Sequence, residues 1–183
     1  MTTPPSRTLY VIVCAAGPAA HVGKLIRQAH ERSWDPHIIT TPTGRAFVDV
    51  AALEAQTGHP VRSEYRKPDD GTRSAPRADA VIVAPATYNT VNKWALGISD
   101  TYALGILAES IGLGLPVAVL PFVNSALAAH PAYRRNVADL RAAGVSILHG
   151  TGYGPEPHAP GTGGALLDSF PWHLALDAVV PNR

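Results

Sequence analysis

Residues 8–16 of the chain are TLYVIVCAA, a run that is apolar almost throughout and rich in β-branched side chains. Such a run is typical of a strand that is covered on both faces, as the strands of parallel sheets are. Gly17 and Pro18 interrupt it, and residues 20–33 then carry apolar side chains at helical spacing. This order of strand, turn and helix predicts the first unit of an α/β protein.

The alternation of strand and helix continues along the rest of the chain. Four more apolar runs predict strands, at residues 38–41, 80–84, 116–120 and 145–148. Helices are predicted at residues 47–58, from about 90, at 101–111, 131–143 and 165–179, the last interrupted at Pro171. Asp100 is the expected N-cap of the 101–111 helix. Because parallel neighbours require crossover connections, the pattern predicts a doubly wound parallel sheet with helices on both faces, a three-layer sandwich.

The size and composition of the chain fit one domain. Its 183 residues are 46% hydrophobic, which is enough to close a core without metals or disulfides. Residues 1–6 are expected to form a disordered tail, and residues 7–183 a single domain. Within that domain, residues 62–77 lack apolar periodicity and predict a surface loop, and the Gly/Pro-rich residues 149–164 predict a flap.

Charge and apolar patterning exclude several classes of partner. With 15 basic and 14 acidic residues and a formal charge of +1, the chain offers no basic patch for a nucleic acid or a membrane surface. No stretch is long and apolar enough to cross a bilayer, and the first residues lack the pattern of a secretion signal. Cys14 is the only cysteine, so the sequence predicts no internal disulfide and a cytoplasmic location.

Polar side chains follow the predicted strands. In doubly wound sheets, ligands bind beyond the carboxyl ends of the strands, where helix N-termini attract anions. Thr43, Thr87, Asn89 and Thr90 lie in these loops and could bind a phosphate through hydroxyl and amide groups. Each is also of a type preferred as a helix cap, so only the cluster favours a ligand site. The first loop, with Gly17 as its one glycine, matches neither the dinucleotide fingerprint nor a P-loop.

Residues 84–100, APATYNTVNKWALGISD, resemble the PASANT motif and following helix of the homo-oligomeric flavin-containing cysteine decarboxylase family. That family includes phosphopantothenoylcysteine decarboxylases and enzymes that oxidatively decarboxylate C-terminal cysteines of peptide antibiotics. CAAGPAAH at 14–21 is similar to the family's first flavin loop, and TPTG at 41–44 to its TPS turn. PFVNSALAAHPAYRRNVADLRAAGV at 121–145 is similar to the segment with the substrate-binding motif PxMNxxMW. The likeness extends over about residues 7–148.

The resemblance implies a flavodoxin-like (Rossmann-like) fold and bound FMN, with FAD as the alternative. By this resemblance, Gly17 and Thr43 would hold the phosphate and ribityl end of the cofactor. The positions that would line the flavin are Pro85, Ala86, Thr87, Asn89 and Thr90. The resemblance also implies a homo-oligomer, a trimer or a dodecamer of trimers, that acts on a small molecule or a peptide.

The chain departs from the family's substrate motif. It keeps Pro121 and Asn124, and Asn124 is the expected contact for a substrate carboxylate. Val123 replaces the first methionine, and neither the second methionine nor the tryptophan is present. The resemblance therefore implies a carboxylate contact without the family's hydrophobic clamp.

The family's catalytic histidine is also missing. It would lie about eight residues before Asp79, where this chain has Gly71. Asp69 or Asp70 in the long loop, or His130 after the PFVN segment, could serve as a substitute base, although a structural role suits each of them better.

The remaining histidines are His21, His30, His37, His59, His149, His158 and His173. None shows the H-x-x-x-H spacing of metal ligands, so the sequence predicts surface or loop roles for them and no metal site.

The leading prediction is an FMN-binding flavoprotein with oxidoreductase or decarboxylase-like chemistry on a small or peptidic substrate that bears a carboxylate or thiol. The missing histidine favours a different class, a non-catalytic flavin-binding subunit, so the sequence leaves open whether the chain is an enzyme. A flavin prenyltransferase is the third alternative, and the chain lacks that group's arginine- and glutamate-rich signatures near the C-terminus.

Overall fold

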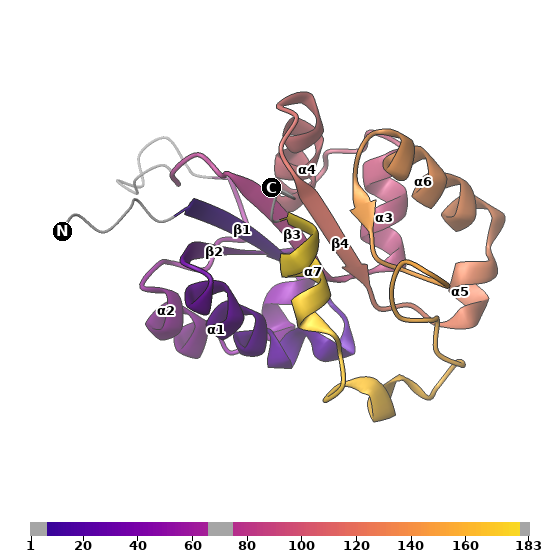
Figure 1. Cartoon of the computed structure of the whole chain (residues 1–183), viewed down its shortest axis with the longest axis horizontal. Helices are drawn as coiled ribbons and strands as arrows, with labels where there is room; N and C mark the ends of the chain where they lie inside the picture. Colours follow the sequence, from indigo (N-terminus) through magenta and orange to yellow (C-terminus); the bar gives the residue numbers. More distant parts are fainter. Residues whose placement is uncertain (1–6, 66–74, 180–183) are drawn as a thin grey trace.

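The computed structural model describes residues 7–65 and 75–179 and shows an all-parallel five-stranded sheet (Figure 1). The strands are β1 (Arg7–Val13), β2 (Trp34–Thr40), β3 (Ala80–Ala86), β4 (Val117–Pro121) and β5 (Ser146–Ile147). Their order across the sheet is β2-β1-β3-β4-β5. This is the strand order of flavodoxin-like sheets, so the predicted fold class is confirmed.

Helices cover both faces of the sheet. They are α1 (Gly23–Glu31), α2 (Val50–Thr57), α3 (Tyr88–Ala95), α4 (Tyr102–Gly112), α5 (Ser125–Ala129), α6 (Pro131–Ala142) and α7 (Trp172–Val179). Short 3₁₀ helices are η1 (Gly17–His21), η2 (Thr43–Phe47) and η3 (Gly163–Leu166). One core cluster packs α1, α2 and α7 against the sheet, and a second packs α3, α4 and α6 against the other face. The predicted three layers are therefore present.

Several predicted boundaries were wrong. Asp100 does not cap α4, because Thr101 is the N-cap and its hydroxyl oxygen accepts a hydrogen bond from the Leu104 N–H at 3.3 Å. The predicted 165–179 helix is a 3₁₀ turn followed by α7, which begins only after Pro171. Proline removes a backbone donor and is tolerated in the first turn of a helix, so the later start is the favourable one.

The predicted loop 62–77 begins with residues that extend the sheet edge. The Arg62 N–H donates to the Ile38 carbonyl at 3.0 Å, and the Thr40 N–H donates to the Arg62 carbonyl at 2.8 Å. Asp69 and Asp70, two of the predicted substitute bases, lie outside the described residues. Across residues 7–65 and 75–179, no helix has the length and apolar character needed to span a bilayer.

Candidate functional site: two cavities at the carboxyl edge of the sheet

Backbone hydrogen bonds hold the loops after β1, β2 and β3 together. The Thr41 N–H donates to the Val13 carbonyl at 3.0 Å, so the loop after β2 crosses the end of β1. The Cys14 N–H donates to the Pro85 carbonyl at 3.1 Å, which ties the first loop to the end of β3. The three loops therefore form one surface at the carboxyl edge, where doubly wound sheets bind ligands.

A polar cavity opens on this surface, and we call it the threonine cavity. Its volume is about 470 Å³. Its lining includes Thr43, Thr87, Asn89 and Thr90, four residues that the sequence analysis places at the flavin. The others are Ala15, Thr41, Pro42, Lys93, Thr101 and Leu104. Residues from three separate crossover loops thus share one cavity.

Thr87 has two roles in this cavity. It is the N-cap of α3, and its hydroxyl oxygen accepts a hydrogen bond from the Thr90 N–H at 3.3 Å. The Thr87 and Thr90 hydroxyl oxygens lie 3.0 Å apart. The capping alternative is therefore correct for Thr87, but the same residue also faces the cavity, so the two interpretations do not compete.

The Cys14 thiol lies next to the Thr90 hydroxyl and donates a hydrogen bond to it. Its sulfur lies 3.3 Å from the Thr90 hydroxyl oxygen, and both residues are buried. Burial raises the pKa of the Cys14 thiol, outweighing the hydrogen bonds from Thr90 and Thr87 that lower it. Cys14 therefore stays a neutral thiol and positions the Thr90 hydroxyl rather than acting as a nucleophile.

Gly44 is a cavity-shaping residue that the sequence analysis missed. A Cβ at this position would lie 2.6 Å from the Val13 carbonyl oxygen and 2.7 Å from the Thr41 hydroxyl oxygen. The Gly44 N–H also donates to that hydroxyl at 3.0 Å. Only glycine allows the TPTG loop to approach β1 this closely. In the sequence, the glycine that ends TPTG was the feature that could have predicted this close approach.

Three other predicted flavin residues are not among those lining the threonine cavity. Pro85 and Ala86 are buried at the end of β3. Gly17 is exposed at the start of η1, and a Cβ there would meet the side chain of Leu167 at 2.7 Å and that of Phe122 at 3.6 Å. Gly17 therefore adjoins the second cavity of this edge.

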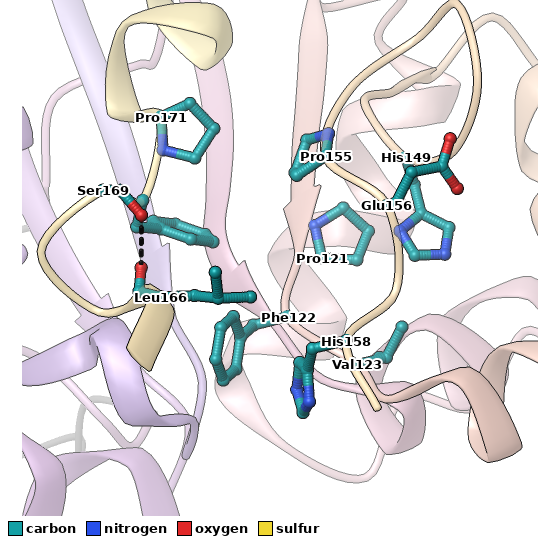
Figure 2. Close-up of a pocket in the computed structure, with 11 residues that line it drawn as sticks. Pro121, Phe122, Val123, His149, Pro155, Glu156, His158, Leu166, Ser169 and Pro171 are labelled. Atoms are coloured by element: carbon teal, nitrogen blue, oxygen red, sulfur yellow. Dashed lines mark hydrogen bonds between the residues drawn. The ribbon is translucent and has the colours of Figure 1, made fainter. Parts of the chain in front are cut away.

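The second cavity, which we call the flap cavity, lies between the 149–158 segment and residues 166–171 (Figure 2). Its volume is small, about 70 Å³, and its lining is mostly apolar. Phe122 stands at its base, with its ring centroid 4.8 Å from the His158 ring and 5.8 Å from the Phe170 ring. Pro121, Val123, Pro155, Leu166 and Pro171 complete its apolar walls.

Three titratable side chains also line the flap cavity: His149, Glu156 and His158. Burial lowers the pKa of His149, and the nearby Arg141 guanidinium lowers it further. The His158 Nδ1 lies 2.9 Å from the Ala159 carbonyl oxygen, to which it donates when protonated. In that tautomer the neutral ring keeps Nε2 as a proton acceptor. The sequence analysis gave these histidines loop roles and missed their meeting at one cavity.

Asn124 is tied to the flap segment. Its backbone pairs with that of His158, and the Ser125 N–H donates to the His158 carbonyl at 2.7 Å. Asn124 is also the N-cap of α5, because its Oδ1 accepts a hydrogen bond from the Leu127 N–H at 2.9 Å. This bond uses the oxygen of the amide, so Nδ2 is the group that can donate to a ligand.

His130 is exposed and caps α6. Its Nδ1 accepts a hydrogen bond from the Ala132 N–H at 3.1 Å, and its ring packs edge-on against Tyr88 at 6.0 Å. It is not among the residues lining either cavity. Tyr88 stacks on Tyr133, with ring centroids 5.6 Å apart, so its ring belongs to the α3–α6 packing.

The comparisons with known proteins agree with this architecture. The family model described as Flavoprotein matches residues 2–165, and the chain belongs to this family. The chain is 29% identical over 184 residues to the coenzyme A biosynthesis bifunctional protein CoaBC of Mycobacterium tuberculosis, covering 90% of this chain and 43% of that protein. It is 28% identical over 129 residues to the CoaBC of Thermococcus kodakarensis, covering 68% and 32%. The chain thus spans less than half the length of these curated relatives.

Solved structures show the same fold. The crystal structure of the FMN-dependent cysteine decarboxylase TvaF from thioviridamide biosynthesis superposes with a TM-score of 0.72 and 25% identity, over 96% of this chain and 99% of that one. The cypemycin decarboxylase CypD superposes with a TM-score of 0.70 and 21% identity, over 94% and 90%. AnUbiX (PadA1), solved in complex with FMN and dimethylallyl pyrophosphate, superposes with a TM-score of 0.64 and 17% identity, over 77% of this chain and 76% of that one. At this identity, CypD and AnUbiX share the fold alone.

Proposed function

We propose that this chain is an FMN-dependent enzyme with decarboxylase-like chemistry on a small or peptidic substrate that bears a carboxylate and a thiol. The observation that carries the proposal is the threonine cavity, in which Thr43, Thr87 and Asn89 come together from separate loops in a chain of the flavoprotein family. The similarity to the FMN-dependent cysteine decarboxylase TvaF over almost the whole chain supports the choice of reaction.

The side chains of the threonine cavity fit a flavin nucleotide. Hydroxyl and amide groups can bind a phosphate and a ribityl chain, and the N-terminus of α3 adds unpaired N–H groups and a partial positive charge. Lys93 adds an ammonium group that already pairs with Asp100, so it offsets the phosphate charge only in part. A volume of about 470 Å³ is within the range of cofactor sites.

The flap cavity supplies titratable groups that the threonine cavity lacks. Asn124 is not among the residues lining either cavity, but its backbone pairs with that of His158, which lines the flap cavity. We assign the Asn124 Nδ2 to the substrate carboxylate, because its Oδ1 is occupied by the α5 cap. Burial and Arg141 lower the pKa of His149, so its imidazole is neutral at pH 7 and can accept a proton. His158 places a second imidazole at the same cavity. Bound FMN would supply the two-electron oxidation of the substrate thiol, and the apolar walls would keep water away from it.

Flavin binding is tested by titrating the purified chain with FMN and following absorbance and flavin fluorescence. Asn89→Asp places a carboxylate at the mouth of the threonine cavity and should weaken FMN binding by tenfold or more, about 1.4 kcal/mol. Leu96→Asp is the matched control, because it adds the same charge at the exposed C-terminal end of the same helix. A colourless protein that binds no added FMN contradicts the proposal.

The substrate assignment is tested with Asn124→Ser. Serine is a good N-cap, so α5 and the thermal midpoint should be unchanged, whereas the amide donor is lost. We expect turnover of a peptide ending in cysteine, measured as released carbon dioxide, to fall at least tenfold with flavin content unchanged. Undiminished turnover places the carboxylate elsewhere.

A second candidate function is a non-catalytic flavin-binding subunit. It is favoured by the lining of the threonine cavity, which within the described residues contains no histidine, aspartate or glutamate. A flavin-loaded protein that releases no carbon dioxide from any cysteine-ending peptide or from phosphopantothenoylcysteine supports this alternative over the enzyme. Assembly into trimers or dodecamers and a cytoplasmic location stay predictions, the first to be measured by light scattering.

A further inference from the structure

A third group of polar side chains lies away from both cavities, at the start of β2. The His59 Nε2 is 2.7 Å from the Asp35 Oδ1, and the His37 Nε2 is 3.1 Å from the Asp35 Oδ2. The ligand atoms of the three residues all lie within 4.8 Å of one another. We call Asp35, His37 and His59 the imidazole–carboxylate cluster.

The fold brings these residues together from two segments. Asp35 and His37 are two apart on β2, so they point to the same face of the sheet. Asp35 lies opposite Thr8, near the first residue of β1, and is therefore at the end of the sheet remote from the two cavities. His59 follows the left-handed cap Gly58 of α2, just before Arg62 pairs with the edge of β2.

The cluster is shielded from solvent on one side. His37 is buried, with a side-chain exposure of 11%, and Asp35 and His59 are about 30% exposed. The His37 and His59 rings stack with centroids 3.8 Å apart, and the Tyr10 ring covers His37 at 6.2 Å. One side of the cluster is thus closed by protein and the other opens to water.

Hydrogen bonds hold the three side chains of the cluster together. Each oxygen of the Asp35 carboxylate lies within hydrogen-bond distance of one histidine Nε2. These bonds outweigh the effect of burial, so the pKa of the Asp35 carboxyl lies below its usual value. A metal ion at this place would displace the protons between the Nε2 atoms and the carboxylate, because these groups bind metals in their deprotonated forms.

We propose that Asp35, His37 and His59 bind one divalent transition-metal ion, with Zn²⁺ as the best-fitting probe. Two imidazoles and a carboxylate are three ligands, and water would take the open fourth position. Ligand atoms about 2.1 Å from a tetrahedral ion stand about 3.4 Å apart. The two nitrogen–oxygen separations of 2.7 and 3.1 Å would therefore have to open by about 0.7 and 0.3 Å, and all the ligand atoms already lie within 4.8 Å of one another.

Two further features shape this site. The two rings stack almost parallel, so we expect one ring to tilt when an ion binds, and His59, on the loop, is the ring with more freedom. The positive charge of Arg62 acts on His37 and would also oppose a bound cation, so we expect weaker Zn²⁺ binding than at a site without that charge. Bound metal would join β2 to the loop after α2.

The experiment uses tag-free full-length protein, freed of metal with EDTA and dialysed, with Zn²⁺ added and Mg²⁺ as the hard-cation control. We expect one Zn²⁺ per chain by calorimetry and metal analysis. The thermal midpoint should rise by about 5–10 °C when free Zn²⁺ is 100 times its Kd. Mg²⁺ should cause no shift, because imidazole ligands favour transition metals.

His59→Gln separates a metal site from a purely hydrogen-bonded cluster. The glutamine amide can still donate to Asp35, so the protein should fold, but Zn²⁺ affinity should fall by at least about tenfold. Asp35→Asn should lower the Zn²⁺ affinity by a similar factor. His173→Gln is the matched control, because His173 is exposed on α7, and it should bind Zn²⁺ like the wild type.

The outcomes are distinguishable. The site is supported if His59→Gln and Asp35→Asn weaken Zn²⁺ binding and His173→Gln leaves it unchanged. No Zn²⁺ retention, no midpoint shift, or equal retention by all four proteins overturns it. FMN content, read at the flavin absorbance band, should be the same in all four, so the result stands apart from the proposed function.

Discussion

The two cavities at the carboxyl edge differ in chemistry although they share one set of strands. The threonine cavity is lined by hydroxyl and amide groups that also cap or position helices, and Lys93 is its one charged residue within the described chain. The flap cavity is lined by proline, phenylalanine and leucine, with His149, Glu156 and His158 among them. One cavity offers neutral hydrogen-bond partners, and the other offers proton acceptors in an apolar setting.

This difference suggests that one cavity is suited to binding the cofactor and the other to proton transfer. Neutral hydroxyls can hold a charged cofactor without introducing a competing acid or base beside it. Titratable groups in a partly apolar cavity are suited to proton transfer, because burial shifts their pKa values. Phe122 lines the flap cavity, and Gly17, in the first loop, lies next to it.

The largest effect is expected at Gly44, in the TPTG loop beside the threonine cavity. Gly44→Ala would place a Cβ 2.6 Å from the backbone oxygen of Val13, which cannot move without shifting β1. We expect a loss of about 1–3 kcal/mol in the free energy of unfolding, measured with urea, and loss of FMN retention. Gly164→Ala, where a Cβ meets nothing within 4 Å, is the control and should be close to neutral. Equal behaviour of the two variants would mean that the TPTG loop tolerates a side chain.

A smaller effect is expected at Thr87, which links the cap of α3 to the threonine cavity. Thr87→Ala removes the hydroxyl that accepts from the Thr90 N–H and should cost about 1 kcal/mol in the free energy of unfolding. FMN affinity should fall as well. Thr87→Ser keeps a hydroxyl and should restore both quantities. If Thr87→Ala lowers stability but leaves FMN affinity unchanged, Thr87 is a cap only.

The pH dependence of stability should separate the flap cavity from the threonine cavity. Burial lowers the pKa of His149, so below the ordinary histidine pKa of about 6.5 the unfolded chain binds a proton that the folded chain does not. The free energy of unfolding therefore falls as the pH drops from 7 toward the lowered pKa. His149→Gln should flatten the profile of thermal midpoint against pH between 7 and 5, and His173→Gln should not change it. An unchanged profile in His149→Gln would show that this imidazole titrates normally.

The sequence predicted the layers of the fold more reliably than the details of the cavities. Continuous apolar runs such as residues 8–16 indicate buried parallel strands, and their alternation with helices predicted the three layers. The strand order came from the structure. Thr43, Thr87, Asn89 and Thr90 were found because polar residues after parallel strands meet at one edge. The meeting of His149 and His158 was missed, because it depends on how an irregular Gly/Pro-rich segment folds back over Phe122.

The imidazole–carboxylate cluster was missed for a related reason. Asp35 and His37 lie on one strand, whereas His59 follows α2. No fixed spacing in the sequence indicates that the residue after α2 packs against β2. The expectation that His37 lies at the surface or in a loop was wrong, since it is a buried strand residue. Sequence patterns are least informative about contacts of this kind, between a strand and the loop that follows the next helix.

The smallest effect is expected at Asp100, the predicted cap of α4. The structure pairs its carboxylate with Lys93 on the surface, and such exposed pairs contribute little. Asp100→Ala should change the free energy of unfolding by less than about 0.5 kcal/mol, whereas Thr101→Ala, which removes the real cap, should cost about 1 kcal/mol. Because Asp100→Ala also frees the Lys93 ammonium at the threonine cavity, FMN affinity should stay equal or rise slightly. A fall in FMN affinity would mean that Lys93 needs Asp100 to hold it in place, and that the threonine cavity depends on this ion pair as well as on its neutral hydroxyls.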